Sequence, residues 1–155
     1  MDRDQVDFFI AAVPKSLDAT PDWRIGNRVG ERRASIPVAV AGAQSPVSLE
    51  MTVRLDDPNY LMALLLVSKR VICRLCTATG HYDRALGEII DASHFHSWPS
   101  NRPLGLALPK KLKNYVTLPP EAEGRTAALA WFFAQNGIDS PDWFANGWPQ
   151  VEAFL

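Results

Sequence analysis

The fold is decided by the stretch Val47-Ser48-Leu49-Glu50-Met51-Thr52-Val53-Arg54-Leu55, in which apolar and polar residues alternate strictly. Successive side chains of a strand point to opposite faces, so this pattern predicts a half-buried strand with one face on the core. The turn-forming residues 56–59 follow, and the continuous apolar run 60–67 then favours a central strand. These two segments predict the middle of a sheet.

The flanking segments add shorter strands and terminal helices. Residues 23–40 contain short apolar runs separated by glycines, with a hairpin expected near Gly30, and 71–77 and 93–98 predict two more strands. Residues 99–109 carry three prolines and favour a loop and an edge segment. Helices are expected before Pro14, at residues 121–136 ending at Gly137, and in a last short segment after Asp139.

The fold class that follows is α+β in a single domain covering residues 1–155. It contains an antiparallel sheet of about five to six strands, with an N-terminal helix and one or two C-terminal helices packed on it. The hairpin-like succession of strands, with helices at the two ends of the chain, is the reason for this prediction.

Composition limits the functional classes. The chain has 16 basic and 17 acidic residues and a net charge of -1, which excludes a wholesale electrostatic attraction to nucleic acid or to an anionic membrane. Most basic residues nevertheless lie between positions 24 and 113, so the middle of the chain is locally basic. No apolar run approaches the roughly 18 residues that span a bilayer, and the acidic start lacks the features of a secretory signal. We expect a cytoplasmic protein with no membrane association.

All three histidines, His81, His94 and His96, lie in one stretch. If residues 93–98 are extended, His94 and His96 share one face at a separation of about 7 Å. They could be ordinary neighbours or hydrogen-bonded core residues. They could also act as acid and base in metal-free phosphodiester cleavage, or hold a divalent metal together with His81, Asp83 or Asp91.

Cys73 and Cys76 are the only cysteines, and their Cys-x-x-Cys spacing raises a zinc alternative. Residues three apart on a strand point to opposite faces, so we expect small core residues there instead. No metal and no cofactor are predicted.

Other side chains are candidates for binding. Arg74, Lys110 and Lys111 are expected to bind substrate phosphates, although a short lysine cluster is more often a solvated loop. Trp98 and Trp148 are expected on an interaction surface.

The chain also resembles a known pattern: Arg74-Leu75-Cys76, Gly80-His81, His94-Phe95-His96, and a late helix with Trp131-Phe132-Phe133. This pattern, over roughly residues 47–140, is similar to a family of bacterial proteins called DUF6978-like. The histidine layout is similar to that of TumE-like toxins of toxin–antitoxin pairs. Tyr82-Asp83-Arg84 departs from the polar loop of the family. The resemblance implies RNA cleavage and an origin in phage or other mobile elements, where small inhibitors of host defence also occur.

Two functions are therefore expected from different classes. The first is a toxin-like RNA endonuclease in which His81, His94 and His96 perform acid–base chemistry. The second is a non-catalytic protein-binding module, such as an inhibitor of a host defence or nucleic-acid-handling complex. The partner is RNA in the first case and an antitoxin or host complex in the second, and the sequence leaves the oligomeric state open.

Overall fold

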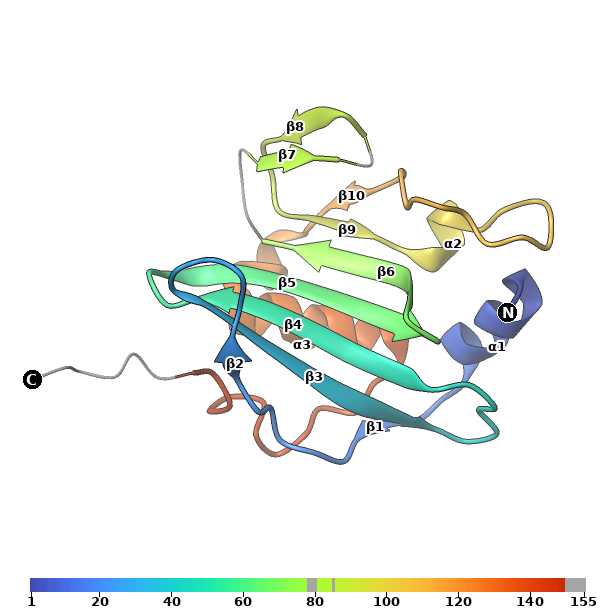
Figure 1. The fold of residues 1–155 in the computed structure, drawn as a ribbon, viewed down its shortest axis with the longest axis horizontal. Coiled ribbons are helices and arrows are strands. Elements are labelled where there is room, and N and C mark those ends of the chain that lie inside the picture. The colour runs from blue at the N-terminus through green and yellow to red at the C-terminus, as the bar shows by residue number, and fades with distance from the viewer. Residues whose placement is uncertain (78–80, 85, 150–155) are drawn as a thin grey trace, which may run out of the picture.

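The computed structural model describes residues 1–77, 81–84 and 86–149, and of His81 only the backbone. Its centre is an eight-stranded sheet whose strand pairs are all antiparallel, in the order β1-β3-β4-β5-β6-β9-β10, with β2 also paired to β3 (Figure 1). The strands are β1 (Lys15–Leu17), β2 (Arg24–Ile25), β3 (Glu31–Val40), β4 (Val47–Arg54), β5 (Asp57–Val67), β6 (Arg70–Cys76), β9 (His94–His96) and β10 (Val116–Thr117).

The two strands predicted at the centre are confirmed as β4 and β5. Leu49 pairs with Ile36 on one side and with Leu65 on the other, and all three side chains are fully buried. The predicted hairpin near Gly30 is also present, because β2 pairs with β3 across it. The sheet has more strands than the expected five to six, since strands of two or three residues carry no periodic signal of their own.

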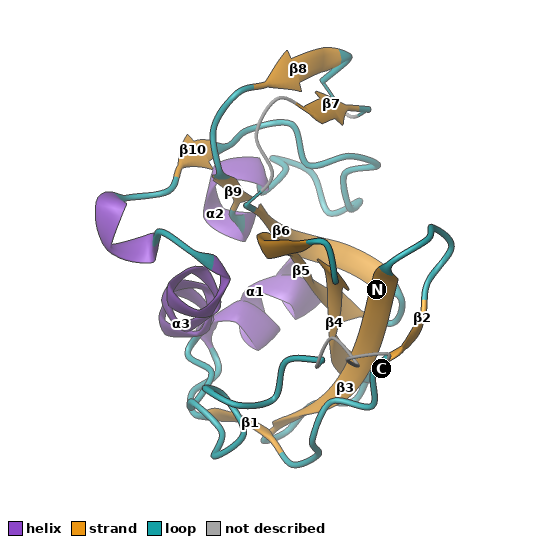
Figure 2. Cartoon of the chain, turned by 90° about the vertical axis from the view of Figure 1, so that its left-hand side faces the viewer, coloured by secondary structure: helices purple, strands orange, loops and turns teal. Residues whose placement is uncertain are grey.

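Helices α1 (Arg3–Ala11) and α3 (Arg125–Asn136) lie on one side of the sheet (Figure 2). Val6 and Phe9 of α1 and Leu129 and Phe132 of α3 join the core-facing side chains of the strands in one buried apolar cluster. Asp2 begins α1 with a capping box completed by Gln5. The burial of both helix faces against the sheet confirms the α+β class.

The start of the C-terminal helix differs from the prediction. Residues 120–122 form a separate 3-10 turn, η1 (Pro120–Ala122), and α3 begins only after Gly124, whose φ of 85° interrupts the helical backbone. The predicted end is confirmed, because Gly137 adopts the left-handed conformation with φ 64°.

Two further predictions about the C-terminal half are wrong. A short helix, α2 (Trp98–Asn101), stands where a loop was expected, because Ser97 caps it and Pro99 fits its first turn. The described residues between 139 and 149 contain turns and no helix. Two residues of the expected last helix, Val151 and Phe154, lie outside the described residues.

A second hairpin is not part of the sheet, although along the chain it lies between strands β6 and β9. It consists of β7 (His81–Asp83) and β8 (Glu88–Ile90), which pair only with each other, so that β6 pairs directly with β9 (Figure 1). This insertion carries Asp83 to the face of the sheet opposite α1 and α3, where Arg74 and His96 lie. In the described part of the chain, no helix is long and apolar enough to cross a membrane.

Lys15 is a fully buried cation on the helical side of the sheet. Its Nζ donates to the carbonyl oxygens of Ile10 at 3.0 Å, Ala12 at 2.5 Å and Asn136 at 2.6 Å. These carbonyls lie at the C-terminal ends of α1 and α3, where no further helical turn supplies donors. Lys15 therefore joins the ends of the two helices.

Candidate functional site

Strand β9 places both of its histidines on the face of the sheet opposite the helices. Arg74 is the cross-strand partner of His96, and Cys76 is that of His94. The two imidazole rings are 5.2 Å apart between centroids and lie edge to face. Between them, Phe95 points to the other face and packs against Trp131 and Phe132 of the helical layer. The alternation expected from the sequence thus brings the two imidazoles together.

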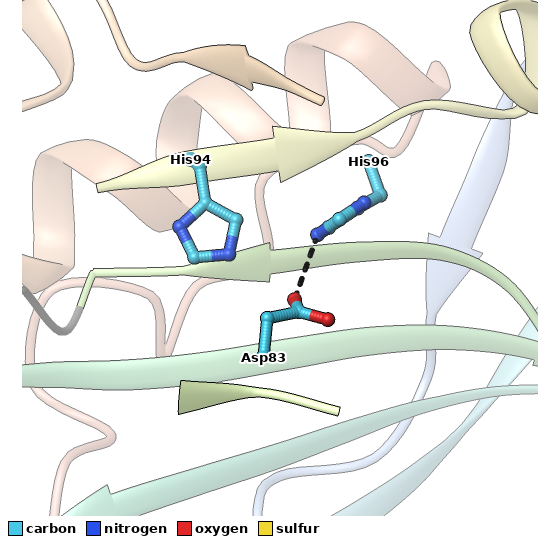
Figure 3. A group of neighbouring side chains, drawn as sticks. All are labelled: Asp83, His94 and His96. Carbon is cyan, nitrogen blue, oxygen red and sulfur yellow. Dashed lines mark ion pairs between the residues drawn. The ribbon is translucent and has the colours of Figure 1, made fainter. Parts of the chain in front are cut away.

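Asp83 approaches this pair from the β7–β8 hairpin (Figure 3). Its Oδ2 accepts a hydrogen bond from Nη2 of Arg74 and lies 3.5 Å from Nε2 of His96. The same Nη2 is 2.9 Å from Nε2 of His96. The other oxygen of Asp83 accepts from the backbone N–H of Leu86 at 3.1 Å, which fixes the carboxylate within the hairpin turn. We call Arg74, Asp83, His94 and His96 the histidine cluster.

The hydrogen bonds fix which ring nitrogens carry protons. A guanidinium only donates, so Nε2 of His96 accepts the bond from Arg74 with its lone pair. A carbonyl only accepts, so Nδ1 of His94 donates to the backbone oxygen of Ala92 at 2.9 Å. Burial, aided by the charges of Arg74 and His94, lowers the pKa of His96 to about 4, although Asp83 opposes this shift. His96 is therefore neutral at neutral pH.

The histidine cluster is covered. His94 and His96 are 0% exposed and Asp83 is buried, whereas Arg74 keeps 26% of its side chain in solvent. Tyr115, which is 38% exposed, packs against both imidazoles at centroid distances of 5.4 and 5.7 Å. A bulky ligand can reach the imidazoles only if Tyr115 or the β7–β8 hairpin moves.

An open cleft of about 1430 Å³ adjoins the cluster. Four arginines from separate segments, Arg28, Arg33, Arg54 and Arg84, line it together with Tyr60 and Tyr82. We call this hollow the arginine cleft. Arg54 lies over the Tyr60 ring at 4.2 Å, and Arg33 pairs with Glu31 at 2.9 Å.

The backbone connects the arginine cleft to the histidine cluster. Ser93, which lines the cleft, directly precedes His94, and Tyr82 directly precedes Asp83. Thr117, another lining residue, is the cross-strand partner of His94 on β10. The two features therefore share one corner of the molecule.

The predicted phosphate-binding residues separate. Arg74 joins the histidines, but Lys110 and Lys111 line a different hollow of about 570 Å³. This hollow has no lining residue in common with the arginine cleft. The side chain of His81 lies outside the described part of the chain, so its predicted role stays a prediction.

The two predicted surface tryptophans also differ from each other. Trp98 is buried, and its Nε1 donates to Asp7 at 2.8 Å, so the expectation that it lies on an interaction surface is wrong. Trp148 is half-buried, lies beside Trp23, and has the guanidinium of Arg125 over its ring at 4.6 Å.

The cysteines point to opposite faces of β6, as their spacing predicts. Sγ of Cys73 lies 3.5 Å from Oδ1 of Asn136 on α3, and Cys76 pairs with His94 across the strands. Burial raises the pKa of the Cys73 thiol to about 12. The two sulfurs therefore do not share a metal site.

Sequence reasoning missed the arginine cleft and the covering Tyr115. The four arginines are spread over 57 positions and form no motif, and only the pairing of distant strands brings them together. The sequence indicates Asp83 only as one possible metal ligand. Comparisons with protein-family models, with curated proteins and with solved structures find no match to this chain.

Proposed function

We propose that the chain binds single-stranded RNA in the arginine cleft. The observation that supports this proposal is the convergence of four arginines and two tyrosines on one open hollow. Guanidinium groups pair with phosphate oxygens and stack on bases, and tyrosine rings stack on bases of any sequence.

The charges of the cleft favour a short ligand segment. Glu31, Asp57 and Glu123 line it beside the four arginines, which leaves a surplus of one positive charge. Tyr82 and Arg84, on the exposed side of the β7–β8 hairpin, and Arg28 are exposed and free to meet a ligand. A few nucleotides of single strand suit this arrangement better than a duplex, whose recognition depends on many phosphate contacts.

Binding is tested with a short labelled single-stranded RNA by fluorescence anisotropy over a salt series. The double variant Arg28→Ala/Arg84→Ala is expected to bind about tenfold more weakly and to reduce the salt dependence. The matched control is Lys110→Ala/Lys111→Ala, which removes the same charge from the other hollow and should change affinity less than about twofold. Equal losses in the two variants, or no binding by the wild type, would refute the proposal.

RNA cleavage at the histidine cluster is a second proposal, favoured by the contiguity of cluster and cleft. In this reaction one imidazole takes the proton of a 2′-hydroxyl and the other protonates the leaving oxygen, while Arg74 stabilises the charge on the phosphate. His96 is neutral at neutral pH, and its Nε2 can take a proton only after the hydrogen bond from Arg74 is released. Because both imidazoles are fully buried, the reaction requires the cover formed by Tyr115 or the hairpin to open.

Cleavage and binding are separated by a second pair of variants. His94→Ala/His96→Ala should abolish cleavage of the RNA while retaining its binding, and a substrate with 2′-deoxyribose at each position should bind without being cut. Retained cleavage by the folded double variant refutes the acid–base role. Binding without any cleavage by the wild type leaves a non-catalytic binding module, for which Trp148 is the remaining predicted surface tryptophan.

A further inference from the structure

We propose that Asp83, His94 and His96 form a binding site for a divalent transition metal of the zinc type. Each of the three side chains offers one ligand atom, and these atoms all lie within 4.8 Å of one another. Ligands about 2.0–2.2 Å from a zinc ion are about 3–4 Å apart, so closing the site requires a shift of only about 1 Å. This inference does not depend on the binding of RNA.

The chemistry of the three groups selects the metal. Two imidazoles and one carboxylate are a nitrogen-rich set that suits zinc and its neighbours, whereas calcium and magnesium prefer oxygen ligands throughout. All three side chains are buried. Their exclusion from water reduces the competition of solvent for the same ligand atoms.

The orientation of the rings supports the same conclusion. His94 donates Nδ1–H to the backbone oxygen of Ala92, which leaves Nε2 as its ligating atom. His96 presents the lone pair of Nε2 toward Asp83. A metal-bound histidine characteristically fixes its tautomer by donating its other nitrogen to a carbonyl or carboxylate, as His94 does here.

Arg74 would compete with the metal for its ligands. Its Nη2 contacts Nε2 of His96 and Oδ2 of Asp83, which are two of the three proposed ligand atoms. A guanidinium and a metal ion cannot share these atoms, because both are cations that need the same lone pairs. Since Arg74 is 26% exposed, its long side chain has a route to solvent when a metal binds.

Metal binding would also fasten the hairpin. Asp83 is on the β7–β8 hairpin, which has no strand pairing with the main sheet, whereas both histidines are on β9. A metal between them would join the two parts directly. It would also take the lone pair of His96, so the acid–base cleavage proposed above belongs to the metal-free state.

The site is tested on the full chain after removal of metals with EDTA. Zn²⁺ is titrated by calorimetry, and Co²⁺ is used as a spectroscopic probe of the ligands. We expect one ion per chain, a tetrahedral Co²⁺ spectrum without thiolate charge-transfer bands, and at least tenfold weaker binding by His96→Ala and by Asp83→Ala. The matched control Cys76→Ser, at the residue paired with His94, should bind as the wild type does.

The decisive variant is Arg74→Met, which removes the competing cation and keeps an unbranched stem like that of arginine. We expect this variant to bind Zn²⁺ at least tenfold more tightly than the wild type. Zn²⁺ should also raise the Tm of the variant by more than it raises the Tm of the wild type. The expected result is a gain in Zn²⁺ affinity, which a poorly folded variant would not produce. Three results would overturn the proposal. The first is unchanged or weaker Zn²⁺ binding by Arg74→Met, and the second is a variant Arg74→Met that is unfolded without metal and does not refold with Zn²⁺. The third is Zn²⁺ binding that survives in Asp83→Ala.

Discussion

Lys15 is a fully buried cation and Arg74 a partly buried one, on opposite faces of the same sheet, and their partners differ in kind. Lys15 donates to three backbone carbonyls that two helix ends leave without donors. Arg74 contacts the side chains of Asp83 and His96, both of which are ionisable. The need of these carbonyls for donors explains why Lys15 is buried. The fold gives no comparable reason to bury two imidazoles and a carboxylate beside Arg74, which is why we place the candidate site there.

The largest effect that we expect concerns Cys73, on the Lys15 side of the sheet. Burial raises its pKa to about 12, so its thiolate fraction near neutral pH is about a thousandfold lower than that of a solvent-exposed cysteine. In a Cys76→Ser background, alkylation of Cys73 at pH 8 should therefore be at least about a thousandfold slower in the native protein than in urea. Mass spectrometry follows the reaction. Similar rates in the two conditions would show that this side of the sheet opens readily.

Lys15→Met tests whether the helix ends need the cation. Three carbonyls lose their donor, at least one of them fully buried, so we expect the free energy of unfolding to fall by about 3 kcal/mol or more. Urea denaturation measures the change. Lys113→Met, which removes an exposed lysine, is the control and should stay within about 0.5 kcal/mol of the wild type.

Asp83→Ala tests the other face. In EDTA, the loss of the carboxylate leaves Arg74 without its buried partner, and we expect a fall of about 2 kcal/mol in the free energy of unfolding. This is smaller than the effect at Lys15, because the partly exposed guanidinium can regain water. Asp83→Asn, which still accepts from the N–H of Leu86, should lose less. A larger loss here than at Lys15 would reverse the comparison and make the cluster the main structural hub.

The smallest effect is expected at Asp7, which pairs with Arg102 at 2.8 Å near the surface. The hydrogen bond from Arg102, and then that from Trp98, lowers the pKa of Asp7 from its ordinary value. The stabilisation is therefore present above the ordinary pKa of an aspartate and is lost as the pH falls through the lower, folded-state pKa. Asp7→Asn should lower Tm slightly at pH 7, and the difference from the wild type should vanish in acid. A difference that persists at the lowest pH would show that the charge of Asp7 is not its cause.

Local patterns were sufficient for the regular elements. The period of two in β4 and β9 placed Leu49 in the core and His94 beside His96, because strand geometry allows no other arrangement of alternate residues. Gly137 similarly marked the end of α3. The start of α3 differs from the prediction, because Glu121 fits a first helical turn, whereas the positive φ of Gly124 interrupts the helix.

The class of fold, the central strands and the shared face of two histidines can be predicted from the amino-acid sequence, since each depends on residues close together along the chain. The surroundings of those histidines depend on how distant segments pack together. The insertion of the β7–β8 hairpin brings Asp83 to Arg74, strand pairing gathers the four arginines of the cleft, and a hydrogen bond joins Trp98 to Asp7 of α1. Such contacts join segments up to 91 positions apart, and their geometry follows from the pairing and packing of whole elements, which no local pattern records.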